Sequence, residues 1–188
     1  MVAVSVCGGT LISASRVLTA AHCWFDGVYQ AWRFTVVLGS IYLFSGGTRI
    51  QTSAVAVHPS WSPTLIRNDV AVIYMPGSVA ISDTIAPVSL PSGFELFESF
   101  AGERAITVGF GVTNETITTD QFLRHVSVVV LSNSDCVRAF PFIAQSSNIC
   151  TSGLGSVGFC NGDSGGPLIV TKDNRQILVR RIRKSTNL

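Results

Sequence analysis

The chain has 188 residues, of which 47% are apolar and 13% are charged, and its net charge is +2. This composition excludes an intrinsically disordered protein, and the length allows a substantial core in one domain or in two small lobes. A transmembrane helix is not expected, because the longest uncharged stretch, residues 139–162, is interrupted by Pro, Gly, Ser and Asn.

The first part of the chain predicts a series of short strands. Residues 2–6 can form a strand that ends at Cys7. Further apolar runs, separated by turn residues, lie at residues 11–12, 17–18, 34–38, 41–44, 50–57 and 70–74. Short strands at this spacing are typical of an all-β barrel or sandwich.

The second part of the chain follows a stretch rich in Pro, Gly and Ser at residues 76–93, which predicts a connection between two lobes. Strands are predicted again at residues 105–111 and 126–131. Between them, Asn114 starts an Asn-Glu-Thr sequence, which is a glycosylation acceptor if the chain is exported. Capping residues at 132–135 predict one short helix over residues 136–140.

Five cysteines divide into two local pairs and one that is left over. Cys7 and Cys23 bracket 15 residues, and Cys136 and Cys150 bracket 13, spacings that suit two disulfides in an exported protein. Each disulfide would contribute about 3 kcal/mol in the loop-entropy model. Cys160 then stays unpaired. No Cys-x-x-Cys or His-x-x-x-His pair indicates a metal, and we expect no cofactor.

The C-terminal end differs in charge from the rest of the chain. Four of the 13 basic residues lie within residues 180–188, which contain no acidic residue. The rest of the chain has nine basic and 11 acidic residues, a net charge of −2. A basic tail can bind nucleic acid or an acidic surface. Four charges on an irregular end are more often solvated, and we expect no nucleic-acid partner.

A serine lies in a glycine-rich turn near the C-terminal end, within the sequence Cys160-Asn161-Gly162-Asp163-Ser164-Gly165-Gly166-Pro167-Leu168. A serine hydroxyl is a poor nucleophile at neutral pH, so it needs a neighbouring base and donors aimed at the oxyanion that it creates. The glycines let the backbone approach a substrate closely, and the amides of Gly162 and Ser164 could converge on one point. Taken alone, such a turn is more often a simple link between strands.

His22 is the candidate base. It precedes Cys23, whose disulfide would hold the imidazole in place, and histidine is the side chain best able to exchange a proton near pH 7. The other two histidines, His58 and His125, have no such fixing neighbour and fit an ordinary packed histidine better.

Asp69 is the candidate partner of the base. It leads directly into the apolar run at residues 70–74, where a carboxylate is costly unless it is hydrogen-bonded. A histidine N–H would satisfy it and fix the tautomer. Equally, Asp69 could cap a turn together with Asn68.

Four blocks then occur in an order and spacing that resemble those of the chymotrypsin-like serine proteases of the trypsin family. They are Cys7-Gly8-Gly9-Thr10-Leu11-Ile12, Leu18-Thr19-Ala20-Ala21-His22-Cys23, Asn68-Asp69-Val70-Ala71-Val72-Ile73 and Gly162-Asp163-Ser164-Gly165-Gly166-Pro167. The resemblance runs from about Cys7 to Val179. Leu90-Pro91-Ser92-Gly93 is most similar to the insect chymotrypsin-like and collagenase-like branch.

The resemblance implies an all-β fold of two antiparallel six-stranded β-barrels, with the active site in the cleft between them. We expect a single peptidase domain over residues 1–188. It would comprise an N-terminal barrel (residues 1–80), a connection (81–104), an incomplete C-terminal barrel (105–179) and an atypical basic tail (180–188).

The resemblance also implies a role for each site residue. Ser164 attacks the scissile carbonyl, His22 takes its proton, Asp69 orients His22, and the amides of Gly162 and Ser164 bind the oxyanion. Gly158 stands where trypsins carry an aspartate at the base of the specificity pocket, so we expect no preference for Lys or Arg.

Partners and location follow from the same resemblance. It implies a secreted, extracellular monomer that acts on protein or peptide substrates and meets protein inhibitors. No metal or other cofactor and no membrane is implied.

The resemblance ends before the family pattern is complete. The family begins with Ile-Val-Gly-Gly, whose freed amine pairs with the residue at Asp163, and the six residues before Cys7 contain neither this segment nor a signal peptide. We therefore expect Asp163 to lack a partner. After Val179 the family continues into a strand, a pocket wall, a cysteine and a helix. That cysteine is the usual partner of Cys160, so we expect a chain truncated at both ends with a free thiol.

Two functions of different class fit these features. One is a serine endopeptidase that works through an acyl-enzyme, and the other is a catalytically inactive homologue that acts as a binding or regulatory protein. Inactive homologues commonly lose a triad residue, whereas His22, Asp69 and Ser164 are all present, which favours the enzyme.

Overall fold

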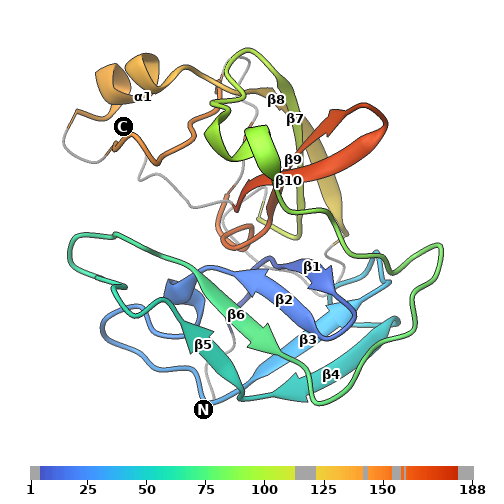
Figure 1. The fold of residues 1–188 in the computed structure, drawn as a ribbon. Coiled ribbons are helices and arrows are strands. Elements are labelled where there is room, and N and C mark those ends of the chain that lie inside the picture. The colour runs from blue at the N-terminus through green and yellow to red at the C-terminus, as the bar shows by residue number, and fades with distance from the viewer. Residues whose placement is uncertain (1–4, 113–121, 142–143, 154–157, 159, 182–188) are drawn as a thin grey trace.

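The computed structural model describes residues 5–112, 122–141, 144–153, 158 and 160–181 (Figure 1). These residues form short strands with one α-helix, α1 (Asn133–Ala139), and two 3-10 helices, η1 (Ala21–Cys23) and η2 (Gly93–Phe97). Figure 1 shows two lobes, with β1 to β6 in the lower one and β7 to β10 in the upper one. The predicted all-β fold is confirmed.

The lower lobe contains the strands β1 (Thr10–Ser13), β2 (Arg16–Thr19), β3 (Phe34–Leu38), β4 (Thr48–Thr52), β5 (Val55–Val57) and β6 (Ala71–Tyr74). They form an antiparallel sheet in the order β1-β2-β6-β5 and a separate β3-β4 hairpin. Buried residues alternate with more exposed ones along β2 and β6, as expected of half-buried strands. Their buried core is Leu11, Val17, Val36, Ile73 and Met75.

The upper lobe contains β7 (Arg104–Gly109), β8 (Arg124–Val129), β9 (Pro167–Lys172) and β10 (Arg175–Arg181), antiparallel in the order β10-β9-β7-β8. Asp173 and Asn174 both have positive φ, which suits the tight two-residue turn between β9 and β10. The core is Phe100, Ala105, Val128, Val130, Leu168 and Val170.

Several elements differ in extent from the prediction. Residues 41–44 form no strand, because Ser40 Oγ lies within hydrogen-bond distance of the carbonyl oxygens of Tyr42 and Ser45 and folds the segment into a loop. Ser5 and Val6 are not in a strand, and residues 2–4 lie outside the described part. Helix α1 begins three residues earlier than predicted, because the Ser132 hydroxyl caps it by accepting from Asp135 N.

The two lobes are less regular than two six-stranded barrels. Among the described residues, the upper lobe has four strands and the lower lobe has six, divided between two sheets. Strand β10 also continues through Arg180 and Arg181, the first two residues of the predicted tail.

The connection between the lobes is attached to the upper sheet through η2. A capping box joins Ser92 and Glu95 at the start of η2. The hydrogen bond from Ser92 N, and to a lesser extent the hydrogen bond from Arg175, lower the pKa of the Glu95 carboxyl. Arg175 forms an ion pair with Glu95, and a second ion pair joins Lys172 to Glu98. Both pairs are partly exposed, so each contributes little to stability and chiefly sets the path of the connection.

Candidate active site

His22 and Asp69 meet because the strands beside them are paired. His22 lies in η1, just after β2, and Asp69 lies just before β6, whose Ala71 pairs with Thr19 of β2. His22 Nδ1 lies 2.8 Å from Asp69 Oδ2, and the His22 main-chain N–H donates to Asp69 Oδ1 at 2.9 Å. The Asp69 side chain is only 3% exposed. One buried carboxylate therefore holds both the main chain and the ring of His22.

This contact fixes the chemistry of the imidazole. A carboxylate only accepts hydrogen bonds, so Nδ1 of the neutral ring carries the proton and Nε2 keeps its lone pair. Nε2 is then the nitrogen that can take a proton. Both oxygens of the Asp69 carboxylate contact His22, which supplies the hydrogen bonds that a buried carboxylate needs.

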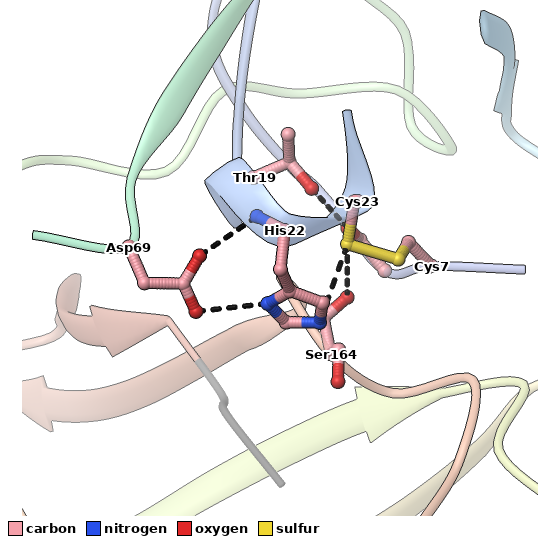
Figure 2. Close-up of a disulfide and its surroundings, with 7 residues drawn as sticks. Cys7, Thr19, His22, Cys23, Asp69 and Ser164 are labelled. Carbon is pink, nitrogen blue, oxygen red and sulfur yellow. Dashed lines mark hydrogen bonds and ion pairs between the residues drawn. A yellow bond between two sulfur atoms is a disulfide. The ribbon is translucent and has the colours of Figure 1, made fainter. Parts of the chain in front are cut away.

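Ser164 comes from the other lobe, in the turn that leads into β9. Figure 2 shows the imidazole between Asp69 and Ser164, with one hydrogen bond to Asp69 from the ring and one from the His22 main chain. Among the residues drawn, none joins the Ser164 hydroxyl to the ring. In free enzymes this bond is often long and tightens only when substrate binds. The structure thus brings the three predicted residues to one place, with Ser164 buried to 8% exposure.

The turn that carries Ser164 is held by its neighbour Asp163. The Asp163 carboxylate accepts from Gly111 N at 2.7 Å and from Cys160 N at 2.8 Å. The expectation that Asp163 has no partner is therefore wrong, because two main-chain amides supply the hydrogen bonds. With Asp163 held in this way, the Gly162 and Ser164 amides donate to no other group among the described residues. Free donors are what an oxyanion hole requires.

Two further glycines contribute to the site. A Cβ at Gly109 or Gly111 would lie 2.0 Å or 2.2 Å from a carboxylate oxygen of Asp163, so only glycine leaves room for that side chain. Sequence reasoning did not assign them a role. The available signal was the Gly109-Phe110-Gly111 sequence at the end of an apolar strand, where glycine often marks a close backbone approach.

Comparison with known proteins gives the family of the chain. The family model described as Trypsin matches residues 1–181. The chain belongs to the trypsin family. This trypsin-family chain is 37% identical over 166 residues to brachyurin from Leptuca pugilator, covering 86% of the chain and 70% of that protein. It is 35% identical over 169 residues to collagenase from Hypoderma lineatum, covering 89% of the chain and 62% of that protein.

A solved structure gives the same result for the fold. The structure of HL collagenase matches with a TM-score of 0.85 at 33% identity, covering 96% of this chain and 74% of that one. The predicted family and branch are confirmed, and the chain is by family a serine endopeptidase.

The cysteines of this trypsin-family chain lie as the spacing predicts. Cys7 is bonded to Cys23 and Cys136 to Cys150, whereas Cys160 is free and exposed. Ligand atoms of Cys7, His22 and Cys23 lie within 4.8 Å of one another, the separation of a metal site. The two sulfur atoms are joined in a disulfide, so they offer no thiolate to a metal.

Gly158, His58 and His125 are the other residues singled out by the sequence that lie in the described part of the chain. Gly158 is exposed, and a Cβ there would meet nothing within 4 Å. Asn114 lies outside the described residues. His58 accepts a hydrogen bond from Ser60 N through Nδ1, and His125 is exposed on β8.

Proposed function

We propose that this trypsin-family enzyme hydrolyses peptide bonds with Ser164 as nucleophile, His22 as general base and Asp69 as the group that orients His22. The proposal rests on one observation. The buried Asp69 carboxylate hydrogen-bonds to both the ring and the main chain of His22, and Ser164 lies on the other side of the ring. This arrangement leaves Nε2 as the proton acceptor on the side of the serine.

The reaction follows from these positions. Ser164 Oγ attacks the carbonyl carbon while its proton moves to His22 Nε2, and the carbonyl oxygen becomes an oxyanion bound by the amides of Gly162 and Ser164. Asp69 stabilises the imidazolium. Nε2 then gives its proton to the leaving amine as the C–N bond breaks, and the acyl-enzyme remains. Water, deprotonated by His22, cleaves the ester and restores the serine.

A fluorophosphonate probe tests the assignment directly, because it reacts with a serine only where a base and an oxyanion hole activate it. We expect one labelled site, and peptide mass spectrometry should place the adduct on Ser164. Prior treatment with a peptide aldehyde that occupies the cleft should prevent labelling. An adduct on another serine would contradict the proposed roles, and a properly folded protein that is never labelled would favour the inactive, binding homologue instead.

Substrate preference is expected to be apolar at the residue before the cleaved bond. Gly158 places no charge where trypsins bind Lys or Arg, and a basic side chain would lose its hydration without gaining a partner. A panel of chromogenic peptides that differ only at this residue measures the preference through kcat/KM. Clear preference for Lys or Arg would refute the prediction.

We infer that the protein acts outside the cell on protein or peptide substrates. Two disulfides support an oxidising compartment. Among the described residues, no helix is both long and apolar enough to span a membrane.

A further inference from the structure

Main chains of the two lobes touch directly beside Ser164. The Gly8 N–H donates to the Ser164 carbonyl oxygen at 2.8 Å. A Cβ on Gly8 would lie 2.6 Å from Gly166 Cα, and a Cβ on Gly165 would lie 2.5 Å from the Gly8 carbonyl oxygen. No side chain fits at either position unless the backbone moves. The turn that carries Ser164 therefore packs directly against the main chain of Gly8.

Gly8 is held in turn by a threonine hydroxyl. Thr19 Oγ1 donates to the Gly8 carbonyl oxygen at 2.8 Å, and Thr19 is 1% exposed. The same hydroxyl lies 2.3 Å from the place where a Cβ of Gly165 would stand. Thr19 is the last residue of β2, three residues before His22. One buried hydroxyl thus connects the segment of the base with Gly8, whose N–H in turn donates to the Ser164 carbonyl oxygen.

We propose that Thr19 is a positioning residue whose hydroxyl, through Gly8, sets the placement of Ser164 relative to His22. The inference rests on the proposed function, since it concerns the geometry of that triad. The connection runs from Thr19 Oγ1 to the Gly8 carbonyl, and from the Gly8 N–H to the Ser164 carbonyl. Thr19 itself contacts no reacting atom in this scheme.

The hydroxyl is needed because glycine cannot fix its own conformation. A glycine backbone adopts many more angles than any other residue, so the orientation of Gly8 depends on bonds from outside. The neighbouring Cys7–Cys23 disulfide also joins the segment of Gly8 to the segment of His22. A disulfide limits how far apart the segments move, whereas the hydrogen bond to Thr19 sets the direction of the Gly8 carbonyl.

Loss of the hydroxyl should act on turnover more than on binding. The Gly8 carbonyl would be left without its buried donor, and a small rotation of Gly8 would carry the Ser164 main chain with it. Misplacement of a reacting group by about 1 Å can lower the rate about a hundredfold. Thr19 is 1% exposed and so out of reach of a substrate, and KM should therefore change little.

Three variants of the full-length protein separate the hydroxyl from packing. Thr19→Val keeps the shape and removes the hydroxyl, while Thr19→Ser and Thr19→Ala lose the same methyl group and differ only in the hydroxyl. We expect Val and Ala to lower kcat about ten- to a hundredfold. The serine variant should keep most of the activity. Thr107→Val is the matched control, because Thr107 is also buried and its hydroxyl has no hydrogen-bond partner in the described part of the chain.

Each outcome decides between defined alternatives. Wild-type kcat in Thr19→Val and Thr19→Ala overturns the inference and leaves the proposed function standing. Equal losses in the serine and alanine variants, or an equal loss in Thr107→Val, show a packing effect and also overturn it. A wild-type protein that neither cleaves peptides nor reacts with a fluorophosphonate overturns both proposals. If Thr19→Val does not fold, the serine and alanine pair decides.

Discussion

Replacement of Ser164 or His22 by alanine is expected to lower kcat about a millionfold, the loss seen when a serine protease loses its nucleophile or its base. The two losses should be equal in size because the residues act as one unit: without Nε2 the hydroxyl keeps its proton, and without the hydroxyl Nε2 has nothing to deprotonate. The double variant should therefore be no slower than either single one. Measurement of kcat on a chromogenic peptide for all three variants tests this.

The histidines provide a control for the same substitution. His125 is exposed on β8, and the hydrogen bonds of His58 within the described residues go to the main chain of Ser60, Trp61 and Val70. His125→Ala and His58→Ala should therefore leave kcat close to that of the wild type. Activity that falls equally with His125→Ala would contradict the assignment of His22. Losses that multiply in the Ser164 and His22 double variant would show that the two residues act independently.

Strands were predicted correctly where an apolar run is bounded by turn residues and is buried in the structure. The prediction at residues 34–38 coincides with β3, whose Val36 faces the core. It failed at residues 41–44, which are equally apolar. There Ile41 is 58% exposed and Phe44 is 49% exposed, and the chain follows the bends of a glycine-containing loop. Composition alone does not distinguish an apolar loop from an apolar strand.

From the sequence, the candidate site could be predicted only for residues whose side chains suggest a chemical role. His22, Asp69 and Ser164 carry groups whose chemistry suggests a role. The partners of Asp163 are main-chain amides, one of them on Gly111, 52 residues away, and every non-proline residue has such an amide. No residue type signals that contact. The Thr19 hydroxyl is hidden for a similar reason, because its partner is the carbonyl of Gly8.

Asp69→Asn is expected to lower kcat about ten-thousandfold while the protein stays folded. Both oxygens of Asp69 are used by His22, one by the main-chain N–H and the other by Nδ1. Asparagine has a single oxygen. If that oxygen keeps the main-chain bond, the amide N–H₂ faces Nδ1 and donates to it, which moves the ring proton to Nε2. The base is then blocked at the nitrogen that faces Ser164, although the fold near His22 is kept.

Asp26→Asn is the matched control, because it makes the same chemical change four residues after His22. Hydrogen bonds from Tyr29 N, the larger effect, and from Val28 N lower the pKa of the Asp26 carboxyl, so it is ionised near neutral pH. Both bonds go to a single oxygen, Oδ1, which asparagine retains. We therefore expect Asp26→Asn to keep wild-type kcat. Thermal unfolding of both variants would show whether either change disturbs the fold. A small, equal effect of the two substitutions on kcat would mean that Asp69 is only a structural link to η1 and does not determine which nitrogen of His22 carries the proton.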